Sequence, residues 1–327
     1  MKLGLALPQY DYSVAGENPL QFETIAEYAR TAERVGFDSV WLSDHLFLDL
    51  AKYGGPSTRF GCYEPLVTLA ALARVVDIRL GTLVMCEALR PAAVLAKALA
   101  SLDRICAGRL DVGLGAGWYE PDYAAIGMEM PRPGERIARL TEAVDVVSGL
   151  LGGGPFSYEG RFHRAQDAVN RPPALQAPRP RVFVGGSGDR LLRLVAEHAD
   201  GWNTCWAWTP DAYRERLDVL TRACDAIDRD PATVWRTLGL YALVGDDEAD
   251  VRRRFERLRS LSPSGIKTLA DFDEFRTGRL VGTTEQVREQ IGAWEALGVD
   301  TIVLGVGAVP FQVTGLDDVE RLAAASA

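Results

Sequence analysis

Asp44 and His45 are the first residues of this chain whose types and spacing suggest chemistry, because they follow the strand-like part of the stretch SVWLSDHLF, residues 39–47. The residues before them are mostly apolar, β-branched or aromatic, as in a buried strand. A neutral imidazole can donate or accept a proton near physiological pH, and a carboxylate at its side can orient it. A single histidine is more often structural, and here Asp44 could act as its cap. The elements that position the two residues must therefore decide between a structural and a chemical role.

His163 and His198, the other two histidines, fall on an expected loop and an expected helix surface, and we interpret both as structural. The sequence has no G-x-S-x-G or H-E-x-x-H motif and no clustered carboxylates and histidines, which argues against a hydrolase triad and against a bound metal. The five cysteines are far apart, with no C-x-x-C pair, so neither disulfides nor zinc are indicated. A reducing cytoplasm is the expected compartment.

The composition is that of a soluble globular protein. The 36 basic and 45 acidic residues give a net charge of −9 and form no basic cluster, so nucleic acid is not an expected partner. No apolar run approaches the roughly 20 residues that cross a bilayer, so no membrane is expected. Pro8 interrupts the apolar start of the chain. We therefore interpret this start as a first strand and not as a signal peptide.

Short apolar runs alternate with helix-length amphipathic segments along the 327 residues. The expected strands are residues 3–8, 39–43, 78–84, 110–115, 181–184, 201–204, 237–244 and 301–305. The expected helices are residues 19–35, 65–74, 91–106, 134–151, 189–197, 210–226, 248–260, 285–297 and 317–325. Most of the strands are continuous in apolar residues, as parallel strands buried on both faces are. Eight strand–helix units predict one TIM (β/α)8 barrel domain over residues 1–327, with an open doubly wound sheet as the alternative.

In a TIM barrel the active site lies at the carboxyl ends of the strands, where Asp44 and His45 would be. Two segments, residues 46–63 and 262–281, are longer than a minimal connection and predict lids or binding loops that form the substrate wall. They carry cations that could bind an anionic substrate or an acidic cofactor tail, although loop cations are more often simply solvated. The cations considered for this role are Lys52, Arg59, Lys267 and Arg279.

Two glycine-rich strand ends suggest contact with a ligand. In VFVGGSGDRLLRLV the backbone N–H groups of residues 186–189 could face an anion at the start of a helix, or the turn could simply be capped by Ser187 or Asp189. Its place after the fifth strand favours a phosphate somewhat. In GLGAGW, Trp118 offers a flat face on which a ligand could stack. The spacing of Gly113, Gly115 and Gly117 by itself favours a structural role, in which the glycines relieve crowding of side chains in the barrel interior.

Several stretches together resemble one known family. They include GFDSVWLSDHL, RPAAVLAKALASLDRICAGRLDVGLGAGWYEPDY, PRPRVFVGGSGDRLLRLVAEHADGWN and LVGTTEQVREQIGAWEALGVDTIVL, in order over essentially the whole chain. They look like the luciferase-like monooxygenase superfamily, and most like its coenzyme F420-dependent oxidoreductases. The resemblance implies a bacterial-luciferase-like TIM barrel that binds a flavin or deazaflavin at its mouth.

The resemblance also implies roles for individual residues. Asp44 and His45 would lie at the deazaflavin ring, with His45 as the proton donor or acceptor beside hydride transfer. Leu83 and Val84 would form a bulge against one ring face, which in such enzymes often contains a non-proline cis peptide. The other residues expected at the cofactor are Cys86, Gly115, Ala116, Gly117, Trp118, Gly185, Gly186, Ser187 and Gly188.

The expected function is therefore hydride transfer between coenzyme F420 and a small organic substrate. An FMN-dependent monooxygenase, supplied with reduced flavin by a separate reductase, is the alternative, and a non-redox phosphate-binding barrel is a third reading. The sugar-phosphate dehydrogenases of the family have a tryptophan and a glutamate where this chain has Asp49 and Trp118, so glucose 6-phosphate is not the expected substrate. Barrels of this family commonly pair, which implies a homodimer.

Overall fold

The barrel predicted from the sequence is closed in the structure, a computed structural model that describes residues 1–326. Its eight parallel strands are β1 Lys2–Ala6, β2 Ser39–Leu42, β5 Arg79–Thr82, β7 Leu110–Gly115, β10 Arg181–Gly185, β11 Gly201–Trp206, β12 Trp235–Gly245 and β14 Thr301–Gly305. Each strand pairs with the next in that order, and β14 pairs with β1, so the barrel has no open edge. The alternative of an open doubly wound sheet was therefore wrong.

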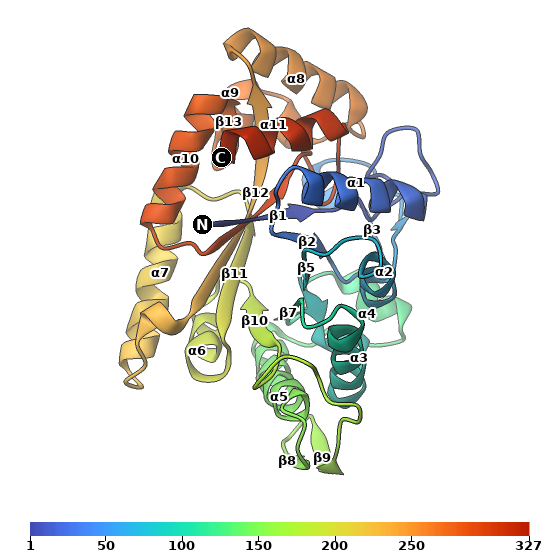
Figure 1. The fold of residues 1–327 in the computed structure, drawn as a ribbon, viewed down its shortest axis with the longest axis vertical. Coiled ribbons are helices and arrows are strands. Elements are labelled where there is room, and N and C mark those ends of the chain that lie inside the picture. The colour runs from blue at the N-terminus through green and yellow to red at the C-terminus, as the bar shows by residue number, and fades with distance from the viewer. Residues whose placement is uncertain (327) are drawn as a thin grey trace.

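The helices predicted from the sequence all form and surround the barrel (Figure 1). They are α1 Phe22–Arg34, α2 Pro65–Leu72, α3 Ala92–Ile105, α5 Pro133–Leu151, α6 Asp189–His198, α7 Pro210–Asp225, α8 Glu248–Leu261, α10 Thr284–Ala296 and α11 Leu316–Ser326. In α1 the fully buried side chains of Ile25, Ala29 and Ala32 recur at helical spacing, which places one apolar face on the sheet. None of the described helices is both long and apolar enough to span a membrane.

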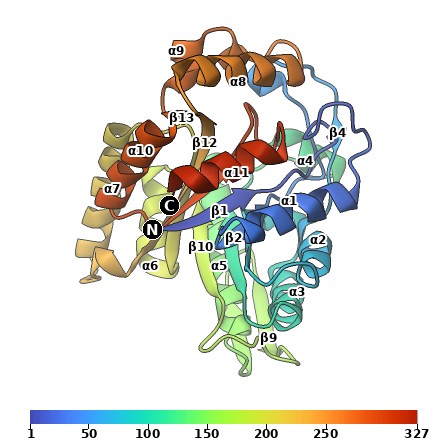
Figure 2. The ribbon, with the colours of Figure 1, turned by 45° about the horizontal axis from the view of Figure 1, so that its top comes forward.

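The shorter elements were not predicted, because each is too brief to show a periodic pattern. They are β3 Phe47–Leu48, β4 Phe60–Gly61, β6 Met85–Cys86, α4 Glu120–Ala125, β8 Phe156–Glu159, β9 Arg164–Ala168, α9 Phe272–Arg276 and β13 Leu280–Thr283. Strands β8 and β9 form an antiparallel hairpin that projects beyond the end of α5 (Figures 1 and 2). Helix α4 matters most, because it lies directly after the strand end of β7.

Aromatic side chains fill the barrel interior below its mouth. Trp41 of β2 is fully buried, and it packs against Phe183 with a ring-centroid distance of 5.8 Å and against Trp235 at 6.4 Å. The neighbouring strands make room for it with glycines, since a methyl group at Gly4 or Gly81 would come within 2.3 or 2.1 Å of the indole. This packing closes the lower part of the barrel and leaves the carboxyl ends of the strands as the place for a site.

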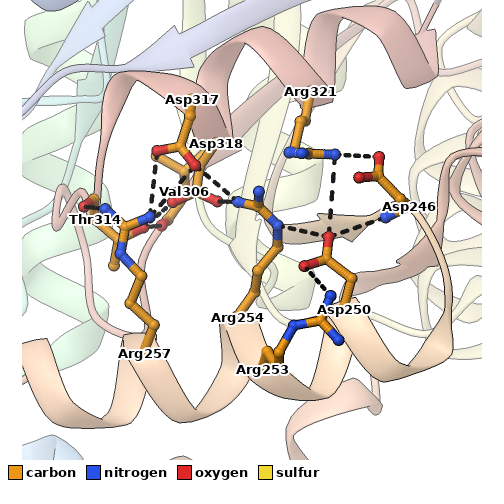
Figure 3. A network of polar contacts seen from close by, with 10 residues as sticks. All are labelled: Asp246, Asp250, Arg253, Arg254, Arg257, Val306, Thr314, Asp317, Asp318 and Arg321. Atoms are coloured by element: carbon orange, nitrogen blue, oxygen red, sulfur yellow. Dashed lines mark hydrogen bonds and ion pairs between the residues drawn. The ribbon is translucent and has the colours of Figure 1, made fainter.

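The last helix completes the ring of helices. Helix α11 lies beside α1, where Arg34 and Glu320 form an ion pair of 2.8 Å (Figure 2). On its other side a polar network joins α11 to α8, with Arg254 of α8 at its centre (Figure 3). The guanidinium of Arg254 donates to Asp317 at 3.0 Å and to Asp318 at 2.7 Å, and it also donates to Asp250 within α8 at 3.0 Å.

Candidate active site

A cavity of about 450 Å³ opens at the carboxyl ends of the barrel strands, within the size range of small-ligand sites. The structure brings twelve of the thirteen residues predicted for the site to its wall. These twelve are Asp44, His45, Leu83, Val84, Cys86, Gly115, Ala116, Gly117, Trp118, Gly185, Gly186 and Ser187. Gly188 does not line the cavity, because it forms the N-cap of α6 just beyond it.

The imidazole of His45 is held by a carboxylate from α4. Its Nδ1 lies 2.6 Å from Oδ2 of Asp122, whose other oxygen accepts the Leu46 N–H at 3.0 Å. Asp122 is buried and acts as an acceptor, so Nδ1–H is the donor and Nε2 carries the lone pair. Nε2 has no hydrogen-bond partner within residues 1–326. The pair therefore presents a proton-accepting nitrogen on a ring that lines the cavity.

Two aromatic side chains pack against the same imidazole. Trp118 and Tyr119 each pack against His45 in a T-shaped arrangement, with ring centroids 5.5 and 5.8 Å away. The Tyr119 hydroxyl donates to Oδ2 of Asp49 at 2.6 Å and accepts the Asp49 N–H at 3.2 Å. Asp49 thus ties the first long segment to the wall around His45, a function that the sequence did not indicate.

Asp44 does not orient His45, which corrects the sequence-based interpretation of the pair. Its carboxylate accepts the Cys86 N–H at 2.9 Å and a guanidinium N–H of Arg90 at 2.7 Å. Burial raises the pKa of Asp44, and the charge and hydrogen bond of Arg90 oppose that effect. Adjacent residues on an extended chain point in opposite directions, so Asp44 faces Arg90 while His45 faces Asp122. The only sequence signal for Asp122 was the run Glu-Pro-Asp after a glycine-rich strand end.

The peptide bond between Leu83 and Val84 is cis, as the family resemblance implied. Val84 lies against glycines of two strands: a methyl group at Gly113 or Gly115 would come within 2.6 Å of its side chain, and one at Gly185 within 3.1 Å. The reading of Gly113 and Gly115 as relief of crowding is therefore confirmed. These glycines let Val84 sit between β7 and β10 as part of the cavity wall.

The turn between β10 and α6 differs from both of its sequence-based interpretations. The N–H of Gly186 is not free, because it donates to the Asn203 carbonyl at 2.9 Å. Neither Ser187 nor Asp189 caps the helix with its side chain; the N-cap is Gly188. The N–H groups of Ser187, Gly188 and Asp189 find no acceptor within the described chain. Three backbone donors at a helix start thus remain available for an anion.

Arg136 of α5 adds a positive charge to the cavity wall and was not predicted from the sequence. One of its terminal nitrogens donates to the Pro131 carbonyl at 2.9 Å, while its buried Nε has no partner in residues 1–326. The starts of α5 and α6 adjoin, since a methyl group at Gly134 would come within 2.7 Å of Arg190. Arg136 and the free N–H groups of α6 therefore suit an anionic group at this end of the cavity.

The two long segments contribute unequally to the cavity. Leu48, Lys52 and Tyr53 of the first segment line it, whereas no residue of segment 262–281 does. The second segment instead braces the first: a methyl group at Gly54 would come within 2.6 Å of the Gly265 carbonyl oxygen. The prediction that both segments form the substrate wall is therefore wrong for the second. The facing wall includes residues that the sequence did not indicate, among them Cys205, Trp206, Trp208 and Phe311.

Comparison with known proteins agrees with this architecture. The family model for luciferase-like monooxygenases matches residues 1–301. An F420-dependent hydroxymycolic acid dehydrogenase of Mycobacterium tuberculosis is 33% identical over 313 residues, 91% of this chain and 81% of the relative. An FMNH2-dependent dimethylsulfone monooxygenase of Pseudomonas putida is 27% identical over 302 residues, 85% of this chain and 81% of the relative.

Among solved structures, an F420-dependent secondary alcohol dehydrogenase in complex with an F420-acetone adduct superimposes with a TM-score of 0.78. The alignment covers 100% of this chain and 99% of the other at 20% identity, so it shows the shared fold. The closed barrel, the cavity at its mouth and the family match define the class. The chain belongs to the luciferase-like monooxygenase family and is an oxidoreductase.

Proposed function

We propose that this protein is an F420-dependent oxidoreductase that transfers a hydride between the deazaflavin and a small organic substrate at a carbon that bears oxygen. The observation that carries the proposal is the His45–Asp122 pair at the cavity, where Nε2 of His45 has no hydrogen-bond partner among the described residues. The 33% identical mycobacterial relative, named as an F420-dependent dehydrogenase of a hydroxy acid, supports the cofactor and the reaction type.

The cavity has the features that a deazaflavin needs. The cis-linked pair Leu83–Val84 and the strand end of residues 115–117 would hold the ring system, with Trp118 as a flat apolar face beside it. The N–H of Ser187 and the guanidinium of Arg136 would hold the phosphate of the side chain. When bound, the deazaflavin supplies or accepts the hydride at its ring.

The His45–Asp122 pair accounts for the proton that accompanies the hydride. When an alcohol is oxidised, Nε2 of His45 takes the hydroxyl proton; when a carbonyl is reduced, the same nitrogen returns a proton to the oxygen. Asp122 holds Nδ1–H and stabilises the imidazolium while the extra proton is present. The aromatic rings of Trp118 and Tyr119 pack against the imidazole and keep it in place.

Titration of the purified protein with F420 and with FMN, each followed by fluorescence, tests this function. We expect F420 to bind more tightly than FMN. Tight FMN binding without F420 binding would overturn the proposal. FMN-dependent oxygen consumption with an organic substrate would then favour a monooxygenase, the activity named for the Pseudomonas putida relative.

Asp122→Asn is expected to lower turnover by about 10–100-fold, the usual effect of removing a partner that orients a functional histidine. The amide can donate to Nδ1, which would move the imidazole proton to Nε2 and leave no base facing the substrate. Steady-state kinetics over a range of pH measure the effect. Asp145→Asn is the matched control, because Asp145 holds His198 at 2.8 Å outside the cavity. Equal turnover in the Asp122→Asn variant and the wild type would contradict the assigned role.

A further inference from the structure

The two carboxylates that line the cavity, and Asp49 beside it, are engaged by protein groups. Asp44 is paired with Arg90, and Asp122 with His45. Asp49 accepts the Tyr119 hydroxyl with one oxygen and the Ala51 N–H with the other. A positive charge in this part of the cavity therefore has no free protein carboxylate to neutralise it.

Lys52 is such a charge. It lines the cavity, its Nζ lies 4.0 Å from the ring centroid of Trp118 and 5.9 Å from that of Tyr53, and no carboxylate within residues 1–326 lies within 4.0 Å of it. Burial raises the pKa of the Cys205 thiol to about 12, and the charge of Lys52 is what opposes this rise. Lys52 is an exposed residue that also lines the cavity, so its ammonium faces both the solvent and the cavity.

A second unpaired cation lies behind the same wall. Trp206 of the wall stacks on Tyr241 with a centroid distance of 5.2 Å, and the guanidinium of Arg279 lies 5.5 Å from the centre of the Tyr241 ring. The Nε of Arg279 and the hydroxyl of Tyr241 are buried and have no partner in the described residues. Burial lowers the pKa of Arg279, while Tyr241 and Glu274 oppose this only in part. Lys52 at the cavity and Arg279 behind its wall are thus two cations without a carboxylate partner among the described residues.

The surfaces between these cations and His45 are apolar or aromatic. Leu48 and Tyr53 come from the first long segment, and Trp206 and Phe311 from the opposite side. Trp118 contacts the His45 ring and also carries the Lys52 ammonium on its face. One indole ring therefore separates the position of proton transfer from the position of the positive charge.

We propose that the substrate is a singly charged organic acid with an apolar or aromatic body. Its acid group pairs with Lys52 over the face of Trp118, and its reacting carbon–oxygen group lies at Nε2 of His45. This proposal rests on the function proposed above and names the substrate class of that same site. A doubly charged phosphate usually takes several convergent donors or a helix N-terminus, and at this end of the cavity the described residues offer a single ammonium, that of Lys52.

Binding of aryl oxo acids tests the substrate class without any cofactor. Benzoylformate, benzoylpropionate and benzoylbutyrate differ in the distance between carbonyl and carboxylate, and each has a neutral methyl ester of the same shape. Quenching of tryptophan fluorescence reports their binding. We expect the best acid to bind the wild type about five- to tenfold more tightly than its ester, and Lys52→Met to remove this difference.

Two further variants separate charge from position. Lys52→Arg should keep most of the preference for the acid, because it keeps the positive charge. Arg59→Met is the matched control: Arg59 is a cation of the same segment that lies over Phe47 at 4.8 Å and does not line the cavity, so its loss should leave the preference unchanged.

Several results would overturn the proposal. They are equal binding of acids and esters to the wild type, no binding of any acid, a preference that survives in Lys52→Met, and tighter binding of phenyl phosphate than of the acids. The cofactor titration is independent of this measurement. Acid preference without F420 binding would reject the proposed function alone, whereas F420 binding without acid preference would reject only this substrate class.

Discussion

His45→Asn is expected to lower turnover with F420 by about 10²–10⁴-fold, the effect of removing a general acid or base, while F420 binding is retained. The asparagine amide can still donate to Asp122, so the wall of the cavity should keep its shape. The variant loses Nε2, which has no hydrogen-bond partner within residues 1–326, together with the part of the ring that packs against Trp118 and Tyr119. Turnover by stopped-flow or steady-state kinetics, with F420 affinity measured in parallel, separates the two effects.

His198→Asn is the matched control for this variant. His198 carries the same chemical group and is also hydrogen-bonded to an aspartate, but it ends α6 outside the cavity. We expect its turnover to equal that of the wild type. Normal turnover in His45→Asn would return His45 to a structural role, whereas a loss of F420 binding together with turnover would assign it to cofactor binding.

Arg254→Met is expected to lower the free energy of unfolding by about 3–5 kcal/mol, because it breaks a buried charge pair and leaves one partner behind. The Arg254 side chain is 11% exposed and that of Asp318 is 8% exposed, so water cannot replace the lost ion pair. Methionine keeps most of the volume of arginine, which limits any added cavity. Urea unfolding followed by circular dichroism measures the change.

Arg257→Met is the control for the Arg254 variant, because it removes a charge from the same network at a position that is 47% exposed (Figure 3). Its cost should be about 0–1 kcal/mol. Equal costs for the two variants would show that burial of the network contributes nothing to its stability.

The cost of losing Arg254 should also shrink in acid. Partial burial by itself would raise the pKa of Asp317, but hydrogen bonds from Arg254 and Arg257 overcome this and lower it. A carboxylate with a lowered pKa stabilises the folded state fully above its unfolded value of about 3.9 and loses this contribution as the pH falls through the folded value. We therefore expect the contribution of Asp317 to the difference between wild type and Arg254→Met to be lost below about pH 4, and a difference that stays constant there would contradict this account.

The sequence by itself determined the barrel and the position of its mouth. The strands of a parallel barrel are buried on both faces, so they appear in the sequence as continuous apolar runs. The helices are buried on one face, so they appear as apolar residues at helical spacing. The order of eight such units then places every strand end at one rim. That is why His45 and Ser187 could be placed at one rim before the structure was known, whereas Val84 was expected there from the family resemblance; all three line the cavity.

The partners of these residues were decided only by the tertiary structure. Asp122 is 77 residues from His45, on a six-residue helix too short to show a period, and Asp44 seemed the nearer carboxylate. The neighbouring strand also decides which backbone N–H groups of the β10–α6 turn stay free. Its Asn203 carbonyl accepts a hydrogen bond from the Gly186 N–H. Lys52 looked like any loop cation until the fold placed its ammonium over the rings of Trp118 and Tyr53 at the cavity. Hydrogen bonds and electrostatic fields act between residues that are close in space and distant in sequence, so neither composition nor spacing records them.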